Sequence, residues 1–116
     1  PNYYAEALNA IKTSASLAPT DPDVFYNLGV LYGQTGDPKN AISSLQKAIE
    51  LKQDYKGGQA YYALGIFYRQ LAVDSKGNVV NTEYNQKAID TIKLMQKLFG
   101  NNQQAEEALK AWGASQ

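Results

Sequence analysis

The chain has 116 residues, enough for one domain with a continuous core. Eleven basic residues balance eleven acidic ones, and this argues against sequence-independent binding of nucleic acid or of an anionic membrane surface, both of which require a basic excess. The absence of cysteine and histidine excludes disulfides, thiol catalysis and metal sites built from thiolate or imidazole. No apolar run approaches the roughly 20 residues of a membrane span, so we expect no membrane insertion by this stretch.

Residues 3–18 predict one amphipathic helix, which ends before Pro19. The chain starts with Pro1 in the middle of this helical pattern. We therefore expect the sequence to be a fragment of a longer protein, in which the apolar face of this helix has a partner.

Residues 22–55 predict a hairpin of two antiparallel helices. Asp21 and Asp37 each precede a proline, which is typical of a helix start because aspartate accepts hydrogen bonds from free backbone N–H groups. Gly36 ends the first helix. Each helix has one apolar stripe: Phe25, Leu28, Gly29 and Tyr32 on the first, and Ala41, Leu45, Ala48 and Ile49 on the second. The spacing allows the two stripes to bury each other.

Residues 58–99 repeat the hairpin pattern with a longer connection. The corresponding positions are Tyr61, Leu64, Gly65 and Tyr68 on the first helix and Ala88, Ile92 and Met95 on the second. Turn-forming residues between 73 and 82 predict a surface loop at the tip of this hairpin.

Residues 102–112 predict a last short helix. Gly100 ends the preceding helix, and Asn101 or Asn102 provides the cap. Ala105, Leu109 and Trp112 form a single apolar stripe.

Residues 22–55 resemble the tetratricopeptide repeat, whose 34-residue pattern is W-x2-L-G-x2-Y, then A-x3-F-x2-A and a closing proline. Seven positions match, with Phe25 in the Trp place and Leu45 in the Phe place, whereas Gln53 replaces the proline. The resemblance implies an all-α fold in which helix hairpins stack as a short right-handed solenoid, with a C-terminal capping helix at 102–112. It also implies one domain over 1–116, with 3–18 as the second helix of a truncated repeat and 58–99 as a repeat with a long loop near 73–82.

In this family, fixed positions of the first helices line a concave, partner-binding face. Transferred to this sequence, they are Asp23, Tyr26, Asn27, Val30, Gly33, Gln34, Gln59, Tyr62, Ala63, Ile66, Arg69 and Gln70. The candidate ligand-binding residues among them are Tyr26, Asn27, Val30, Gln34, Tyr62, Ile66, Arg69 and Gln70. They combine apolar contact, amide hydrogen bonding and one cation, which suits an extended protein segment. The alternative is that they are simply solvated helix faces.

Some family members hold a chaperone's C-terminal carboxylate in a clamp of Lys, Arg and Asn side chains. Here only Asn27 matches such a place, which argues against a clamp.

Nine tyrosines also suggest a role in stacking on sugars or bases. Most of them fall on core positions or near helix ends, and the remaining candidates for exposure are Tyr3, Tyr26, Tyr62 and Tyr84.

The sequence sets up no pair of carboxylates for acid–base catalysis. Glu106 and Glu107 are adjacent and point in different directions on a helix, while Asp21 and Asp37 act as caps. We therefore expect no enzyme activity, no cofactor and no metal site.

The leading hypothesis is a non-enzymatic scaffold that binds a protein or peptide on its concave face. Two alternatives remain. One is the soluble tail of a bacterial membrane protein that polymerises or ligates glycans. The other is self-association, as a homodimer, through the apolar face of residues 3–18.

Overall fold

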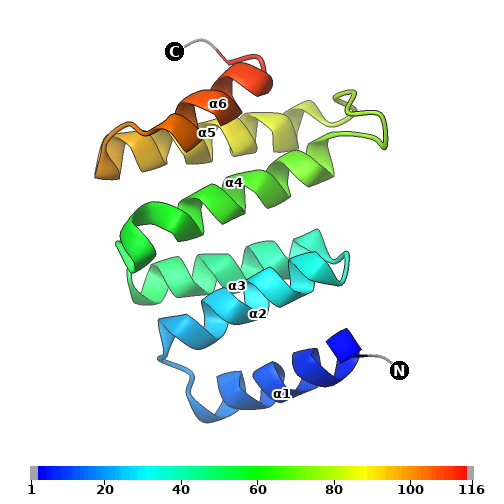
Figure 1. Cartoon of the computed structure of the whole chain (residues 1–116), viewed down its shortest axis with the longest axis vertical. Coiled ribbons are helices and arrows are strands. Elements are labelled where there is room, and N and C mark those ends of the chain that lie inside the picture. Colours follow the sequence, from blue (N-terminus) through cyan, green and yellow to red (C-terminus); the bar gives the residue numbers. More distant parts are fainter. Residues whose placement is uncertain (1–2, 115–116) are drawn as a thin grey trace.

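The computed structural model describes residues 3–114, and its fold is all-α, as the sequence predicts. The elements are α1 (Tyr3–Leu17), α2 (Pro22–Gln34), α3 (Pro38–Leu51), the short 3₁₀ helix η1 (Tyr55–Gly58), α4 (Gln59–Ala72), α5 (Thr82–Phe99) and α6 (Gln103–Ala111). Figure 1 shows the helices stacked along one axis, with α1 at one end and α6 at the other. The stack measures 42 × 31 × 21 Å, and it is longest in the direction in which the helices succeed one another.

Side-chain caps fix the starts of four helices. The carboxylates of Asp21 and Asp37 accept hydrogen bonds from the backbone N–H groups of α2 and α3, at 2.9 and 3.2 Å. Asn81 and Asn102 cap α5 and α6 in the same way, at 3.0 and 2.8 Å. Each cap satisfies a donor that the helix itself leaves unpaired.

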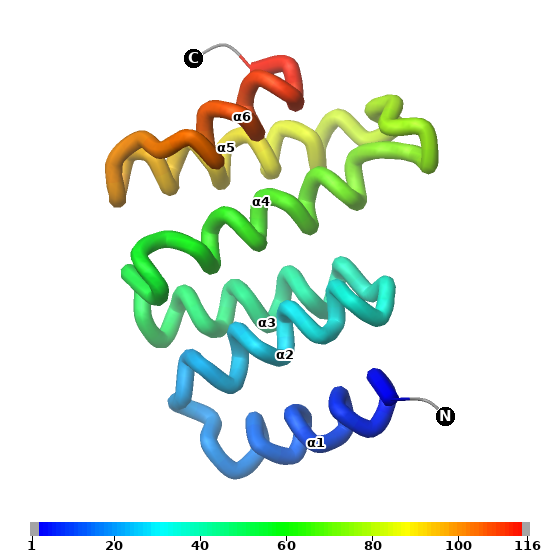
Figure 2. The backbone as a smooth tube through the Cα atoms, in the orientation of Figure 1, coloured from blue at the N-terminus to red at the C-terminus, as the bar shows by residue number. Residues whose placement is uncertain are grey.

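The helices form antiparallel hairpins whose chain path runs back and forth across the stack (Figure 2). In the view of Figure 1, α2 lies in front of α3 and α6 lies in front of α5. The hairpins α2–α3 and α4–α5 each bury their facing stripes, and α3 packs on α4 to join them. The hairpins therefore form one continuous stack.

Two clusters of buried side chains hold the stack together. The first joins the two hairpins and contains Ile42, Leu45 and Leu64. The second joins α4, α5 and α6 and contains Tyr61, Ile89, Ile92, Met95, Ala105, Ala108 and Leu109. Ile49 packs against both clusters, so the core is continuous from α3 to α6.

The connection from α3 to α4 is a tight turn with left-handed backbone. Lys56, Gly57 and Gly58 have φ angles of +50°, +62° and +100°. At Gly58 a Cβ atom would also lie 2.8 Å from Cδ2 of Phe99, so both the backbone conformation and the packing require glycine. This turn lets α4 return along α3.

Residues 73–81 form the loop between α4 and α5, and it protrudes from the stack (Figures 1 and 2). The Asp74 carboxylate accepts hydrogen bonds from the backbone N–H groups of Lys76 and Asn78, each at 2.9 Å. An isolated antiparallel bridge pairs Val73 with Val79, which the sequence did not indicate. The loop is therefore a folded excursion held by local hydrogen bonds.

Candidate functional site

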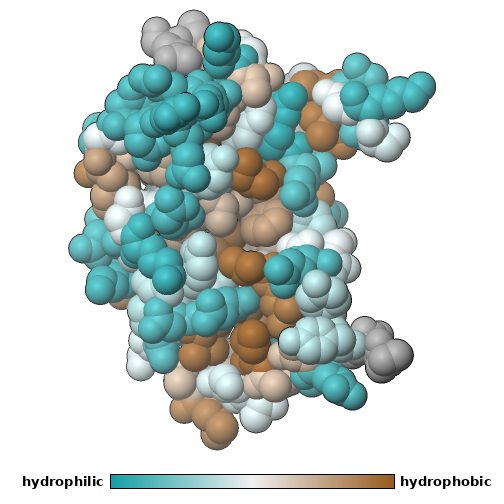
Figure 3. Space-filling view, viewed as in Figure 1, coloured by the Kyte–Doolittle hydropathy of each residue, from teal (hydrophilic) through white to brown (hydrophobic). Residues whose placement is uncertain are grey.

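The candidate binding residues all lie on α2 and α4, the first helices of the two hairpins. None of them is buried. The half-buried ones are Tyr26, Val30, Tyr62, Ile66 and Arg69, and the exposed ones are Asn27, Gln34 and Gln70. Figure 3, in the same view as Figure 1, shows apolar patches down the middle of this face with hydrophilic side chains beside them. We call these eight residues the first-helix surface.

Tyr26 is part of an aromatic pair at one edge of this surface. Its ring centroid lies 5.2 Å from that of Tyr55, and the Lys56 ammonium lies 5.6 Å from both centroids. Tyr55 is only 5% exposed, and its hydroxyl donates a hydrogen bond to Asp23. Burial, together with this hydrogen bond and the charge of Asp23, raises the pKa of Tyr55 above its usual value. Tyr26 is therefore half-buried, with Tyr55 and Lys56 packed against its ring.

Arg69 is engaged by the C-terminal part of the chain. Its guanidinium donates a hydrogen bond to the side chain of Asn85 on α5, and its Cζ lies 5.9 Å from the ring centroid of Trp112. At the other end of α4, Gln59 donates to Gln104 of α6 at 3.1 Å. The last helix thus contacts the start of α4, Trp112 directly after that helix contacts Arg69, and Arg69 is held by intramolecular contacts.

Tyr62 packs against the buried cluster that joins α4, α5 and α6. Asn27, Gln34 and Gln70 make no side-chain hydrogen bond to the described part of the chain. Their amides are free to pair with a ligand. The central and most available part of the first-helix surface thus combines these amides with Val30 and Ile66.

Phe67 brings the two first helices together at a place that the sequence analysis did not single out. A Cβ atom on Gly33 would lie 2.3 Å from Cζ of Phe67, so the ring fills the space beside this glycine. The pairing of an aromatic residue with a glycine 34 positions earlier is the sequence signal that could have indicated this contact. Gly33 is thus a packing residue.

The tyrosines divide as follows among the described residues. Tyr3 is 72% exposed, as the sequence suggests, but Tyr4 is also exposed, at 47%. Tyr26, Tyr62 and Tyr84 are only half-buried, each against neighbouring side chains. The tyrosines therefore do not form a shared stacking platform on the first-helix surface.

Residues 3–114 contain neither a cluster of metal-ligating side chains nor a membrane-spanning helix. Acidic side chains do not gather there into a group of three or more that could hold a metal ion. None of the helices in this range is both long and apolar enough to cross a membrane.

The fold defines a protein of the helical-repeat class, in which antiparallel helix hairpins stack through a shared core. Residues 22–55, which comprise α2, α3 and the start of η1, match the family model described as "Tetratricopeptide repeat". Residues 22–55 are therefore a tetratricopeptide repeat. Repeats of this family are in general non-enzymatic modules that bind proteins or peptides, which supports a scaffold role.

The curated relatives include "DnaJ homolog subfamily C member 3" from Rattus norvegicus and from Mus musculus. Each is 30% identical to this chain over 57 residues, which is 49% of this chain and 11% of the relative. The chain thus spans about a tenth of the length of these relatives. Both are rodent proteins, so they lend no support to the alternative of a bacterial membrane protein.

Proposed function

We propose that this chain is a non-enzymatic scaffold that binds a segment of another protein along its first-helix surface. In this proposal residues 1–116 act as one domain made of a half repeat, a full repeat, a repeat with an enlarged loop, and a capping helix. The observation that carries it is the tetratricopeptide repeat match over residues 22–55.

The chemistry of the surface supports an extended peptide as ligand. Val30 and Ile66 are half-buried apolar side chains that a ligand could cover further. Exposed amides at Asn27, Gln34 and Gln70 offer both donors and acceptors, which match the N–H and C=O groups of an extended backbone. Because Arg69 is already bound to Asn85, the surface does not depend on a charged ligand.

The test is a selection of peptides from a displayed random library on the purified chain, followed by binding measurements with two double variants. The first, Asn27→Arg with Gln34→Arg, adds bulk and charge to the first-helix surface. The matched control, Ser43→Arg with Gln86→Arg, makes the same charge change at exposed positions on α3 and α5. We expect the first variant to weaken the selected peptides by about tenfold or more and the control to leave them unchanged.

Equal losses of peptide affinity in the two variants would show that the peptides do not bind the first-helix surface. Unchanged affinity in both would do the same, because the peptides would then bind elsewhere. A far-ultraviolet circular dichroism spectrum of each variant verifies that the helices are intact.

Self-association is a second candidate, favoured by a specific observation on α1. This helix has no buried residue, and Leu17 is 81% exposed while Tyr3 is 72% exposed. A second copy could cover these side chains. Light scattering over a range of concentrations should then show a dimer that Leu17→Asp shifts toward monomer; a monomer at every concentration would remove this candidate.

A further inference from the structure

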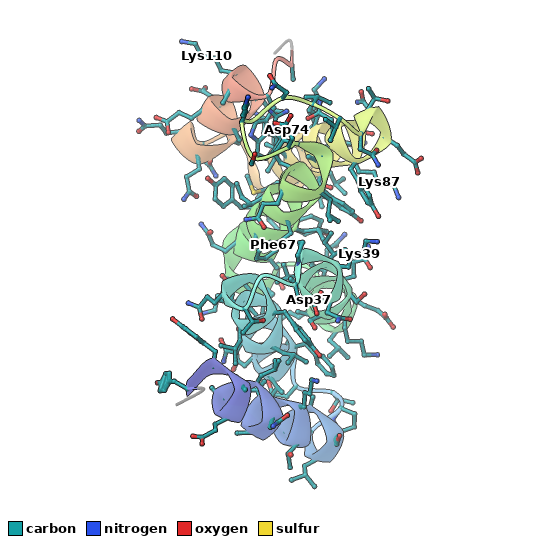
Figure 4. The ribbon with its side chains drawn as sticks, turned by 90° about the vertical axis from the view of Figure 1, so that its right-hand side faces the viewer. Asp37, Lys39, Phe67, Asp74, Lys87 and Lys110 are labelled. Atoms are coloured by element: carbon teal, nitrogen blue, oxygen red, sulfur yellow. The ribbon has the colours of Figure 1, made fainter. Side chains whose placement is uncertain are left out.

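A hollow of about 290 Å³ lies between the start of α3, the end of α4 and the start of α5. Its lining consists of Lys39, Ile42, Gln46, Tyr68, Leu71, Tyr84 and Lys87. None of these belongs to the first-helix surface. Figure 4 shows Lys39 and Lys87 on the same side of the stack, one above the other. We call this place the lysine–tyrosine hollow.

Two tyrosines and one lysine form a compact group in this hollow. The rings of Tyr68 and Tyr84 are stacked, with centroids 6.2 Å apart and an interplanar angle of 29°. The Lys87 Nζ atom lies 5.9 Å from the Tyr68 centroid and 5.7 Å from the Tyr84 centroid. This attraction between a cation and aromatic faces keeps the ammonium at the hollow.

The hydrogen-bonding state of Tyr68 leaves a donor for a ligand. Gln46 donates from Nε2 to the Tyr68 hydroxyl oxygen at 2.9 Å, so the hydroxyl acts as an acceptor in this bond. Its own proton remains available to donate to a further oxygen. Together with two lysine ammonium groups, the hollow presents donors that suit an anionic oxygen.

The charged side chains that line the hollow are both cationic. Lys39 and Lys87 contribute two cations to the lining, and no carboxylate among residues 3–114 lines it. Glu83 approaches Lys87 at 3.9 Å, but its side chain is 82% exposed, so this surface pair competes weakly. Asp37 caps α3 and accepts a hydrogen bond from Nδ2 of Asn40 at 2.6 Å. The lining itself is therefore cationic, while the nearby Glu83 is exposed and Asp37 is engaged at the start of α3.

We propose that the lysine–tyrosine hollow binds an acidic side chain of a partner protein, a glutamate or aspartate next to an apolar residue. The carboxylate is neutralised by Lys39 and Lys87 and accepts the Tyr68 hydroxyl proton. The apolar neighbour packs on the half-buried Leu71, beside the buried Ile42. This surface is separate from the first-helix surface, so the chain has a second contact with selectivity for acidic partners.

The probe is a fluorescein-labelled synthetic peptide of alternating glutamate and leucine, and its matched control contains glutamine in place of glutamate. We expect the glutamate peptide to bind and the glutamine peptide to bind at least about tenfold more weakly. Lys87→Glu should weaken the glutamate peptide by about tenfold or more. Lys93→Glu makes the same charge change on α5 outside the hollow and should alter binding by less than about twofold. Thermal unfolding followed by circular dichroism verifies that both variants are folded.

Three results would overturn the proposal. The first is no binding of the glutamate peptide up to millimolar concentration. The second is equal losses in Lys87→Glu and Lys93→Glu, which would indicate a general charge effect. The third is a single-stranded oligonucleotide that binds more tightly than the peptide and is lost with Lys87→Glu, which would assign the hollow to nucleic acid. The double variant at Asn27 and Gln34 should leave the peptide bound, which separates this test from that of the first-helix surface.

Discussion

At Gly29 the two helices of the first hairpin are so close that no side chain fits between them. A Cβ atom there would lie 2.8 Å from Cγ of Leu45 and 3.2 Å from the carbonyl oxygen of Ala41. Leu45 and Ala41 are both fully buried, so neither can move into solvent. The glycine and the small alanine of the repeat pattern thus have a direct steric cause.

Gly29→Ala should therefore destabilise the fold by about 1–3 kcal/mol, because the new methyl group overpacks a full core. The free energy of unfolding in urea measures this. A Leu45→Ala background removes the two atoms that lie nearest to the new methyl group, so the same change should cost much less there. If the two costs are equal, the close approach of the helices is not the reason for this glycine.

The raised pKa of the Tyr55 hydroxyl should make the stability of the fold depend on pH. Its pKa is raised in the folded state, so the folded chain retains this proton at a pH where the unfolded chain releases it. The resulting stabilisation is complete below the usual tyrosine pKa of about 10 and is lost as the pH rises beyond it. Between pH 8 and pH 11 the urea midpoint of the native chain should fall further than that of Tyr55→Phe.

The exposed Tyr3 provides the matched control for this experiment. Tyr3→Phe should retain the pH dependence of the native chain. An identical fall in the native chain and in Tyr55→Phe would show that the Tyr55 hydroxyl does not carry this effect.

At the scale of the elements, local signals in the sequence predict most of the helix starts. Asp21 and Asp37 before prolines indicate α2 and α3, and the structure shows both aspartates accepting from the backbone. Asn102, one of two candidates in the sequence, is the residue that caps α6. Such signals act within a few residues, which is why they are readable without tertiary contacts.

Contacts between distant segments are the part that the sequence does not reveal. Arg69 donates a hydrogen bond to Asn85 and lies over the ring of Trp112. These contacts depend on how the 73–81 loop positions α5 and on where the last helix packs. The lysine–tyrosine hollow depends on the same placement, because it combines Lys39 with Tyr84 and Lys87 across two hairpins. The repeat pattern assigns positions within a hairpin but does not encode the path of an inserted loop.

The Asp74 carboxylate should control the local order of the 73–81 loop. Backbone hydrogen bonds from Asn78 and Lys76 lower the pKa of this carboxyl. These hydrogen bonds therefore order the loop above the usual carboxyl pKa of about 4, and this order is lost as the pH falls below that value. Asp74→Ala should speed amide hydrogen exchange at Lys76 and Asn78 at neutral pH without changing the thermal midpoint of the whole chain.

Asp54→Ala is the control, because Asp54 is exposed and makes no capping hydrogen bond with its side chain. It should leave exchange in the loop unchanged. If Asp74→Ala also leaves it unchanged, the carboxylate does not order the loop.

For the whole molecule, the stack predicts a gradient of stability along its axis. The helix α1 has no buried residue, whereas α3, α4 and α5 contribute to clusters that are continuous through Ile49. In a stack of repeats each helix is stabilised mainly by its neighbours, so the weakly packed end opens first. Hydrogen exchange should be fastest in α1 at low concentration, and protection equal to that of α4 would contradict the gradient.

In the proposed function, the first-helix surface of α2 and α4 binds a segment of a partner protein. The most direct measurement is an NMR titration of the isotopically labelled chain with a peptide selected on it, in which each backbone amide reports its own environment. We expect chemical-shift changes concentrated at Asn27, Val30, Ile66 and Gln70, on the two first helices. Shifts confined to α3 and α5, or spread evenly over the chain, would contradict the proposed function.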